Sequence, residues 1–118
     1  MYIAGFVIPV PEDKRETYRR WSEATSRLLI EHGCIEIVES WEDNVPDGTR
    51  TDFRKAVAAK SGEKIVFSWQ IWPDRESVDR VERAMAEDPR FEPPDDLPFD
   101  QKRLIMGCFE PLFSTRTG

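Results

Sequence analysis

Large apolar side chains occupy both alternating sets of positions in two segments of the chain, Tyr2–Val10 and Ile65–Trp72. This pattern is typical of β-strands covered on both faces, because a strand with one solvent-exposed face alternates apolar with polar residues. Shorter apolar stretches predict two further strands, at Ile35–Trp41 and Arg103–Phe113. The pattern therefore predicts four strands with apolar groups on both sides.

Two segments between these strands have the period of an amphipathic helix. The first is predicted to start at Pro11, which is tolerated in a first helical turn and is followed by two acidic residues, and to end before Gly33. Its apolar stripe consists of Tyr18, Trp21, Thr25, Leu28 and Leu29. The second helix is predicted between an N-cap at Asp74 and a stop at Asp88-Pro89. Its stripe consists of Val78, Val81 and Met85.

These elements follow the order βαββαβ, and we expect one domain over residues 1–118. Right-handed split βαβ connections predict a ferredoxin-like α+β fold, a four-stranded antiparallel sheet with both helices on one face. Asn44–Thr51 is predicted as a turn and Phe91–Pro98 as a proline-rich loop. Thr51–Val57 is predicted as a short helix capped by Thr51, and the start of the next strand is the alternative.

This fold leaves one face of the sheet without helices, although that face carries large apolar side chains. Each such side chain left in water forgoes roughly 2 kcal/mol. Four or five of them would cost about as much as the whole stability of a typical domain. We therefore expect a second copy of the chain to cover the face through a two-fold interface. The alternative is a helix around Phe53 that folds over it as a lid.

The formal net charge of -6 restricts the classes of partner that the protein can bind. Nucleic acid and anionic membrane surfaces are both disfavoured, because each requires a concentrated basic surface. The longest apolar run, Ile3–Val10, is too short to span a bilayer and lacks the basic lead-in of a secretory signal. We expect a cytoplasmic protein that binds neither nucleic acid nor membrane.

No catalytic or metal-binding signature stands out in the sequence. Cys34 and Cys108 lie in apolar stretches without metal-ligand spacing, so both are predicted to be buried, unpaired cysteines. His32 lies at a predicted helix end, where an imidazole caps carbonyl groups. A calcium loop near Asp47 is rejected, because Arg54 stands where a bidentate glutamate is needed. We expect no metal and no cofactor.

Short motifs distributed along the chain resemble those of the uncharacterised bacterial YbaA-like family. They are Gly5-Phe6-Val7 with Pro9-Val10-Pro11, Glu39-Ser40-Trp41, Val45-Pro46-Asp47-Gly48 with Thr51-Asp52-Phe53, Val66-Phe67-Ser68-Trp69, Asp88-Pro89-Arg90, and Pro98-Phe99-Asp100 with Lys102-Arg103. The resemblance runs from Gly5 to about Glu110. It implies the dimeric α/β-barrel superfamily, in which two ferredoxin-like subunits close their sheets into a barrel.

The resemblance brings no established activity with it. Many members look to have Tyr-Gly-Gly-Phe near the end, where this chain has Met106-Gly107-Cys108-Phe109. A pocket lined there would be more apolar and richer in sulfur. Superfamily relatives include cofactor-independent monooxygenases, isomerases and haem-degrading enzymes, but this analogy lies at the level of the fold. Haem would require an axial ligand, for which His32 is poorly placed.

Six residues are the candidate lining of a small-molecule pocket, which requires an apolar cavity with a few convergent polar groups. They are Trp41, Asp52, Ser68, Trp69, Arg103 and Met106. The alternative is that the aromatic residues are core and that Asp52 and Arg103 form a structural ion pair.

The sequence thus predicts a homodimer that binds a small molecule. One alternative is a cofactor-independent monooxygenase- or isomerase-like enzyme. The other is a non-catalytic interaction module.

Overall fold

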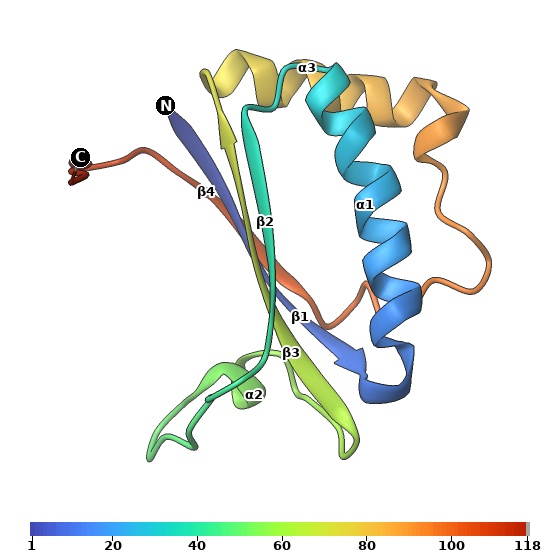
Figure 1. Ribbon diagram of the computed structural model, residues 1–118, viewed down its shortest axis with the longest axis vertical. Helices are drawn as coiled ribbons and strands as arrows, with labels where there is room; N and C mark the ends of the chain where they lie inside the picture. Colours follow the sequence, from blue (N-terminus) through green and yellow to red (C-terminus); the bar gives the residue numbers. More distant parts are fainter. Residues whose placement is uncertain (118) are drawn as a thin grey trace.

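The computed structural model describes residues 1–117, which form a four-stranded sheet and two long helices (Figure 1). The elements are β1 (Tyr2–Pro11), α1 (Arg15–Glu31), β2 (Glu36–Trp41), α2 (Phe53–Ala56), β3 (Glu63–Trp72), α3 (Arg75–Glu87) and β4 (Ile105–Phe109). Two 3-10 turns accompany them, one before α1 at Glu12–Lys14 and one after α3 at Pro89–Phe91. None of the helices in this part of the chain is long and apolar enough to cross a membrane.

The strands lie in the order β2-β3-β1-β4, and each is antiparallel to its neighbours. Phe6, in the middle of β1, lies opposite Ser68 of β3 and Met106 of β4. A βαββαβ chain with this strand order has the ferredoxin-like topology. The α+β fold that the sequence predicts is therefore confirmed.

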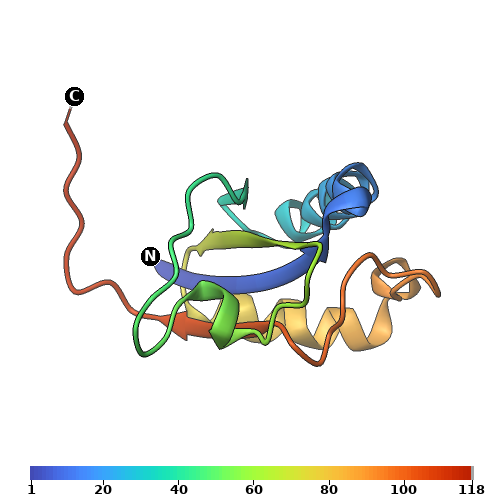
Figure 2. The ribbon, with the colours of Figure 1, turned by 90° about the horizontal axis from the view of Figure 1, so that it is seen from below.

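The core lies between the sheet and the two long helices, which cover the same face (Figures 1 and 2). Side chains alternate along a strand, so the even-numbered residues of β1 point towards the helices. One buried cluster forms near the start of α1, and a second joins the end of α1 to α3. The first consists of Ile8, Val10, Tyr18 and Val66, and the second of Leu29, Cys34, Trp72, Val78 and Val81.

The short helix α2 is confirmed, but its predicted cap is wrong. The Asp52 carboxylate, and not Thr51, accepts a hydrogen bond from the backbone N–H of Lys55 at 2.7 Å. Asp52 also accepts one from the backbone N–H of Gly48 at 2.9 Å. A carboxylate at this position satisfies two backbone donors at once, which a threonine hydroxyl one residue earlier does not.

The last strand is shorter than the predicted range, Arg103–Phe113. Only Ile105–Phe109 pairs with β1, opposite Ile3–Val7. Arg103 instead closes a turn, in which its backbone N–H donates to the carbonyl oxygen of Asp100 at 3.2 Å. Pro111 follows and has no N–H with which to extend the ladder. After β4 the chain leaves the sheet on the side opposite the helices (Figures 1 and 2). There Leu112 is 100% exposed and Phe113 82% exposed.

The sheet face turned away from the helices is apolar and largely uncovered. Phe67, Ile105 and Phe109 on this face are 44%, 45% and 60% exposed. The helix α2 covers one end of the face only, where Phe53 packs edge-on against Phe67 with ring centroids 6.0 Å apart. A lid around Phe53 therefore forms, but it leaves the greater part of the face bare. We call this surface the open face.

The predictions for the cysteines and the histidine are confirmed in part. Cys34 is buried, as expected, whereas Cys108 is exposed because it lies on the edge strand β4. Both are unpaired thiols. His32 lies after α1 and places its ring Nδ1 3.2 Å from the carbonyl oxygen of Leu28, as a C-terminal cap does.

Candidate functional site

A cleft of about 370 Å³ lies between α1 and the edge strand β2. Side chains two residues apart on β2 share one face, so Ile37, Glu39 and Trp41 all turn towards α1. The helix contributes Ser22 and Ser26, whose small side chains leave space between helix and strand. The volume falls in the range of small-molecule pockets, roughly 300–1,000 Å³.

Three polar side chains form a hydrogen-bonded chain that leads from the lining of this cleft into the protein interior. The Tyr18 hydroxyl donates to Oε2 of Glu39 at 2.5 Å, and the Ser68 hydroxyl donates to Oε1 of the same carboxylate at 2.7 Å. Tyr18 is 3% exposed and Ser68 1% exposed. Buried hydroxyls need a partner, and Glu39 supplies it to both. Glu39 itself is exposed, so its carboxylate joins the interior to the cleft.

The phenol of Tyr18 is held in its protonated form. Burial raises the pKa of Tyr18 strongly, and the neighbouring Glu39 carboxylate raises it further through its charge and hydrogen bond. Tyr18 is therefore a fixed hydrogen-bond donor at neutral pH.

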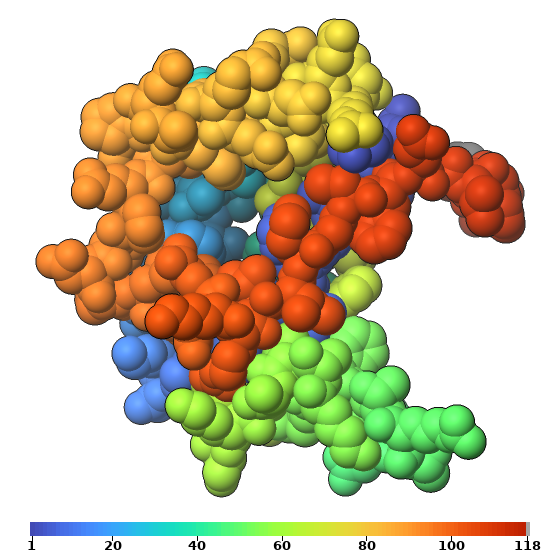
Figure 3. Space-filling view, turned by 180° about the vertical axis from the view of Figure 1, so that it is seen from behind, coloured from blue at the N-terminus to red at the C-terminus, as the bar shows by residue number. Residues whose placement is uncertain are grey.

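A second, smaller cavity of about 100 Å³ lies deeper, on the other side of the Tyr18–Glu39 hydrogen bond. It shares Tyr18, Ser22, Ser26 and Glu39 with the cleft. Seen from behind, the molecule is hollowed between α3 and the segment that leads to β4, with α1 visible at the bottom of the hollow (Figure 3). Aromatic rings form much of the wall, where Trp21 and Phe99 meet edge-on with centroids 5.0 Å apart.

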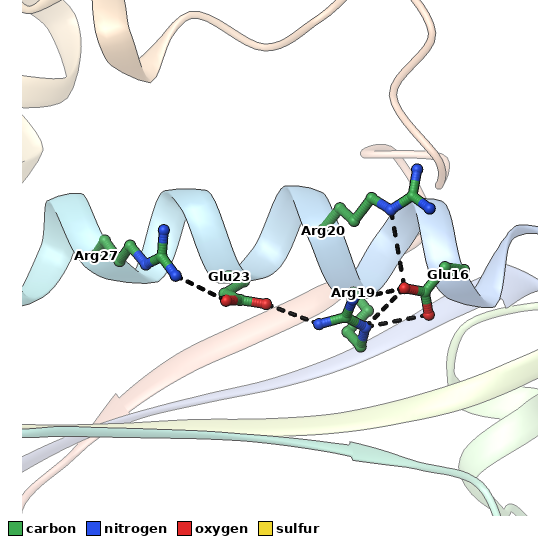
Figure 4. Close-up of polar contacts among 5 residues, drawn as sticks. All are labelled: Glu16, Arg19, Arg20, Glu23 and Arg27. Atoms are coloured by element: carbon green, nitrogen blue, oxygen red, sulfur yellow. Dashed lines mark hydrogen bonds and ion pairs between the residues drawn. The ribbon is translucent and has the colours of Figure 1, made fainter.

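The mouth of the cleft is positively charged at one end. The Arg15 guanidinium lies over the Trp41 ring, 5.3 Å from its centroid, as in a cation–π contact. Arg19 also lines the cleft, but Glu16 and Glu23 hold its guanidinium (Figure 4). Arg15 has no ion pair with any residue between 1 and 117.

The open face carries a separate hollow of about 620 Å³ with almost no polar lining. Gly5 and Gly107 lie opposite each other on β1 and β4. The Phe109 ring leans over them, so that a Cβ built at Gly107 would lie 3.1 Å from its Cζ. Trp69 and Met106 also line this hollow.

The structure divides the six candidate residues among three places. Trp41 and Ser68 lie on the helix side of the sheet, Trp41 at the cleft and Ser68 at the deeper cavity. Trp69 and Met106 line the hollow of the open face.

Asp52 and Arg103 are tied to other groups. Asp52 holds the turn before α2, as described above, and its backbone hydrogen bonds lower its pKa. Arg103 forms two 2.7 Å hydrogen bonds with the buried carboxylate of Glu63 and one of 3.0 Å with Asp100. The alternative that Asp52 and Arg103 pair with each other is therefore wrong. Arg103 instead fixes the segment before β4 to the start of β3.

Tyr18 and Glu39 were not among the candidates from the sequence. The helical pattern counts Tyr18 as an apolar residue of the first helix, and it gives no information on the hydroxyl group. Glu39 gave a usable signal, because it is a carboxylate between Ile37 and Trp41 on the same strand face. A charge on an otherwise apolar face needs a buried partner.

Fold and cleft together define a ferredoxin-like α+β protein with a cavity between helix and sheet. The family model described as "Protein of unknown function (DUF1428)" matches residues 1–101, and the chain belongs to this family. The "Uncharacterized protein YbaA" of Escherichia coli (strain K12) is 45% identical over 112 residues, which are 94% of this chain and 96% of that protein. The protein of the same name from Shigella flexneri has the same values. The predicted YbaA-like resemblance is confirmed.

A solved structure shares the fold at low sequence identity. It is described as a dimeric ferredoxin-like protein from an uncultured marine organism, and it superposes with a TM-score of 0.55 at 12% identity. The match covers 99% of this chain and 100% of that one.

Proposed function

We propose that the chain functions as a homodimer that binds a small molecule in the cleft between α1 and β2. The single observation that carries the binding function is the chain Tyr18–Glu39–Ser68, which presents an ordered carboxylate to a cavity that also has apolar side chains in its lining. A small-molecule site combines these same features. The unpaired thiol of the exposed Cys108 suits the reducing cytoplasm.

The dimer rests on the open face. Phe67, Ile105 and Phe109 together expose a contiguous apolar surface, which monomeric proteins rarely retain. The segment after β4, which carries the exposed Leu112 and Phe113, is directed away from the helices (Figure 2). The dimeric ferredoxin-like protein of similar fold supports a two-fold assembly.

Each of the six candidates then has a role in this proposal. Trp41 lines the cleft, and Ser68 donates a hydrogen bond to the Glu39 carboxylate of the cleft. Trp69 belongs to the interface, where it lines the apolar hollow, and Met106 lies beside it on the edge strand β4, in register with Phe6. Asp52 and Arg103 are positioning residues, which hold the segments beside the sheet.

An isomerase-like enzyme is a second candidate, favoured by the pairing of Glu39 with Tyr18. A carboxylate in a cavity can take a proton from a carbon next to a carbonyl group and return it to another carbon of the same substrate. The phenol would remain a hydrogen-bond donor throughout, as its raised pKa requires. This route needs no oxidant, and its atoms balance within the one substrate.

A ligand screen by thermal shift tests the binding function. We expect at least one compound from a panel of neutral, cationic and anionic metabolites to raise the melting temperature of the wild-type protein. Glu39→Gln should abolish that shift, whereas Glu82→Gln, an exposed carboxylate on α3, should retain it. A panel without any hit, or a hit unaffected by Glu39→Gln, would favour the non-catalytic interaction module.

A further inference from the structure

We infer that the ligand of the cleft is a small planar organic acid with a hydrogen-bond donor at the end opposite its carboxylate. This inference rests on the proposed function of the cleft and specifies its chemistry. It follows from the two ends of the cleft, which carry opposite charges, and from the distance between them.

The positive end is Arg15. Its guanidinium is positioned by the Trp41 ring and has no carboxylate partner within residues 1–117. A guanidinium over an aromatic face keeps the N–H groups along its edge, and these match the two oxygens of a carboxylate. Arg15 can therefore bind a carboxylate without first breaking an ion pair.

The other end accepts hydrogen bonds. Glu39 has about four lone-pair sites as a carboxylate, and Tyr18 and Ser68 occupy two of them. The protons of both hydroxyls are directed at Glu39, so this end offers acceptors to a ligand. A hydroxyl or amino group of the ligand fits here, and a second anionic group would be repelled.

The backbone spacing below the two ends suits one aromatic ring. Glu39 and Trp41, whose ring carries the Arg15 guanidinium, are two residues apart on the same face of β2, so their backbones lie roughly 7 Å apart along the strand. A benzene ring with substituents at opposite positions has about this length. Ile37, Trp41 and Val66 line the cleft and provide apolar contacts for such a ring.

The same charges argue against polyanionic ligands such as nucleotides. Arg19 is the second cation of the cleft, but Glu16 and Glu23 neutralise it (Figure 4). Glu23 and Glu39 add negative charge to the lining. One available guanidinium matches one carboxylate, and several phosphate charges would lack partners.

Calorimetric titration with three related probes tests the inference. 4-Hydroxybenzoate has both end groups, 4-hydroxybenzamide lacks the charge, and benzoate lacks the donor. We expect 4-hydroxybenzoate to bind the wild-type protein more tightly than either analogue, by roughly tenfold, since each analogue loses a hydrogen bond that involves a charged group.

Variants of both ends complete the test. Arg15→Gln should lower the affinity for 4-hydroxybenzoate to that of the wild-type protein for 4-hydroxybenzamide. The affinity of Arg15→Lys for 4-hydroxybenzoate should fall between those of Arg15→Gln and the wild type. Arg83→Gln, which removes an exposed charge on α3, should change nothing. Glu39→Gln should bind 4-hydroxybenzoate and benzoate with equal affinity.

The outcomes separate this inference from the proposed function. If 4-hydroxybenzamide binds as tightly as the acid, or Arg15→Gln leaves the affinity unchanged, the inferred ligand class is wrong. If none of the three probes binds but the wider metabolite panel gives a Glu39-dependent hit, the ligand class is wrong and the cleft remains a binding site. If neither the probes nor the panel bind, both proposals fail.

Discussion

The Tyr18 hydroxyl lies 2.5 Å from Oε2 of Glu39, and this hydrogen bond joins the first turn of α1 to the edge strand β2. This bond is the main polar link between the helix and the strand that form the cleft. The buried phenol keeps its proton because burial and the adjacent carboxylate both raise its pKa. The bond therefore serves both the packing of the helix and the orientation of the carboxylate.

Removing this hydroxyl should destabilise the protein and loosen the cleft. Tyr18→Phe deletes a hydrogen bond to a charged group, so we expect the free energy of unfolding to fall by about 1.5–3 kcal/mol. Urea denaturation of the purified protein measures the change. Tyr2→Phe is the control, because Tyr2 is partly buried on β1 and Glu39 accepts its hydrogen bonds from Tyr18 and Ser68 instead. Equal stability of Tyr18→Phe and the wild type would show that the bond contributes nothing.

A charge on the open face should separate the two copies. Phe109 is 60% exposed in one chain, so Phe109→Glu costs little in a monomer but would bury a carboxylate in the dimer. We expect the variant to sediment as a monomer at micromolar concentration, where the wild type sediments as a dimer. Met85→Glu, which changes a 41% exposed side chain on α3, should leave the dimer intact. A wild-type protein that sediments as a monomer would contradict the proposed homodimer.

Arg103 should be required for stability. Arg103→Ala leaves the buried Glu63 carboxylate without its bidentate partner, so we expect a loss of about 2–3 kcal/mol in the free energy of unfolding. Arg27→Ala, which breaks an exposed pair with Glu23, should cost less than about 1 kcal/mol. Similar losses for the two variants in urea denaturation would contradict this assignment.

The same pair predicts a loss of stability in acid. The hydrogen bonds from Arg103 hold the pKa of Glu63 below its ordinary value in the folded protein. The stability that Glu63 contributes is therefore complete above the unfolded pKa, about 4.3, and is lost as the pH falls through the lower folded value. Urea midpoints measured from neutral to acid pH should fall less steeply for Arg103→Ala than for the wild type. Parallel curves would exclude this contribution.

The cap of α2 gives a local prediction. Asp52→Ala removes the acceptor for the backbone N–H groups of Gly48 and Lys55. We expect the free energy of unfolding to fall by about 1 kcal/mol. Thr51→Ala is the matched control, since Thr51 is exposed and makes no capping bond. Hydrogen exchange should accelerate at Lys55 in the first variant only. Faster exchange in both would point to a shared role.

The sequence predicted the fold well because strand and helix periods are local signals. The double apolar pattern of β1 and β3 identified both the core and the open face, which the structure confirms. The capping residue was missed, since Thr51 and Asp52 are adjacent and both accept hydrogen bonds. The exposure of Cys108 was missed because an edge strand has the same local pattern as a central one.

The candidate site could be predicted only in part. Trp41 and Ser68 were found as polar or aromatic residues on strands, but their grouping with Tyr18 depends on how α1 crosses the sheet. That crossing is a tertiary feature, which no periodicity in the sequence encodes. Arg103 was predicted to line the pocket or to pair with Asp52, whereas its partner is Glu63, which lies 40 positions earlier in the chain.

The Phe109 ring rests on Gly107 of its own strand, because a Cβ at Gly107 would lie 3.1 Å from the ring, whereas a Cβ at Gly5 on the neighbouring strand would make an ordinary contact at 3.9 Å. A methyl group at position 107 would therefore push the ring outwards, and a methyl group at position 5 would not. A change at position 107 would thus alter the surface that any partner of the aromatic ring meets, and we expect compensating replacements at position 109. These two residues of β4 would then evolve together.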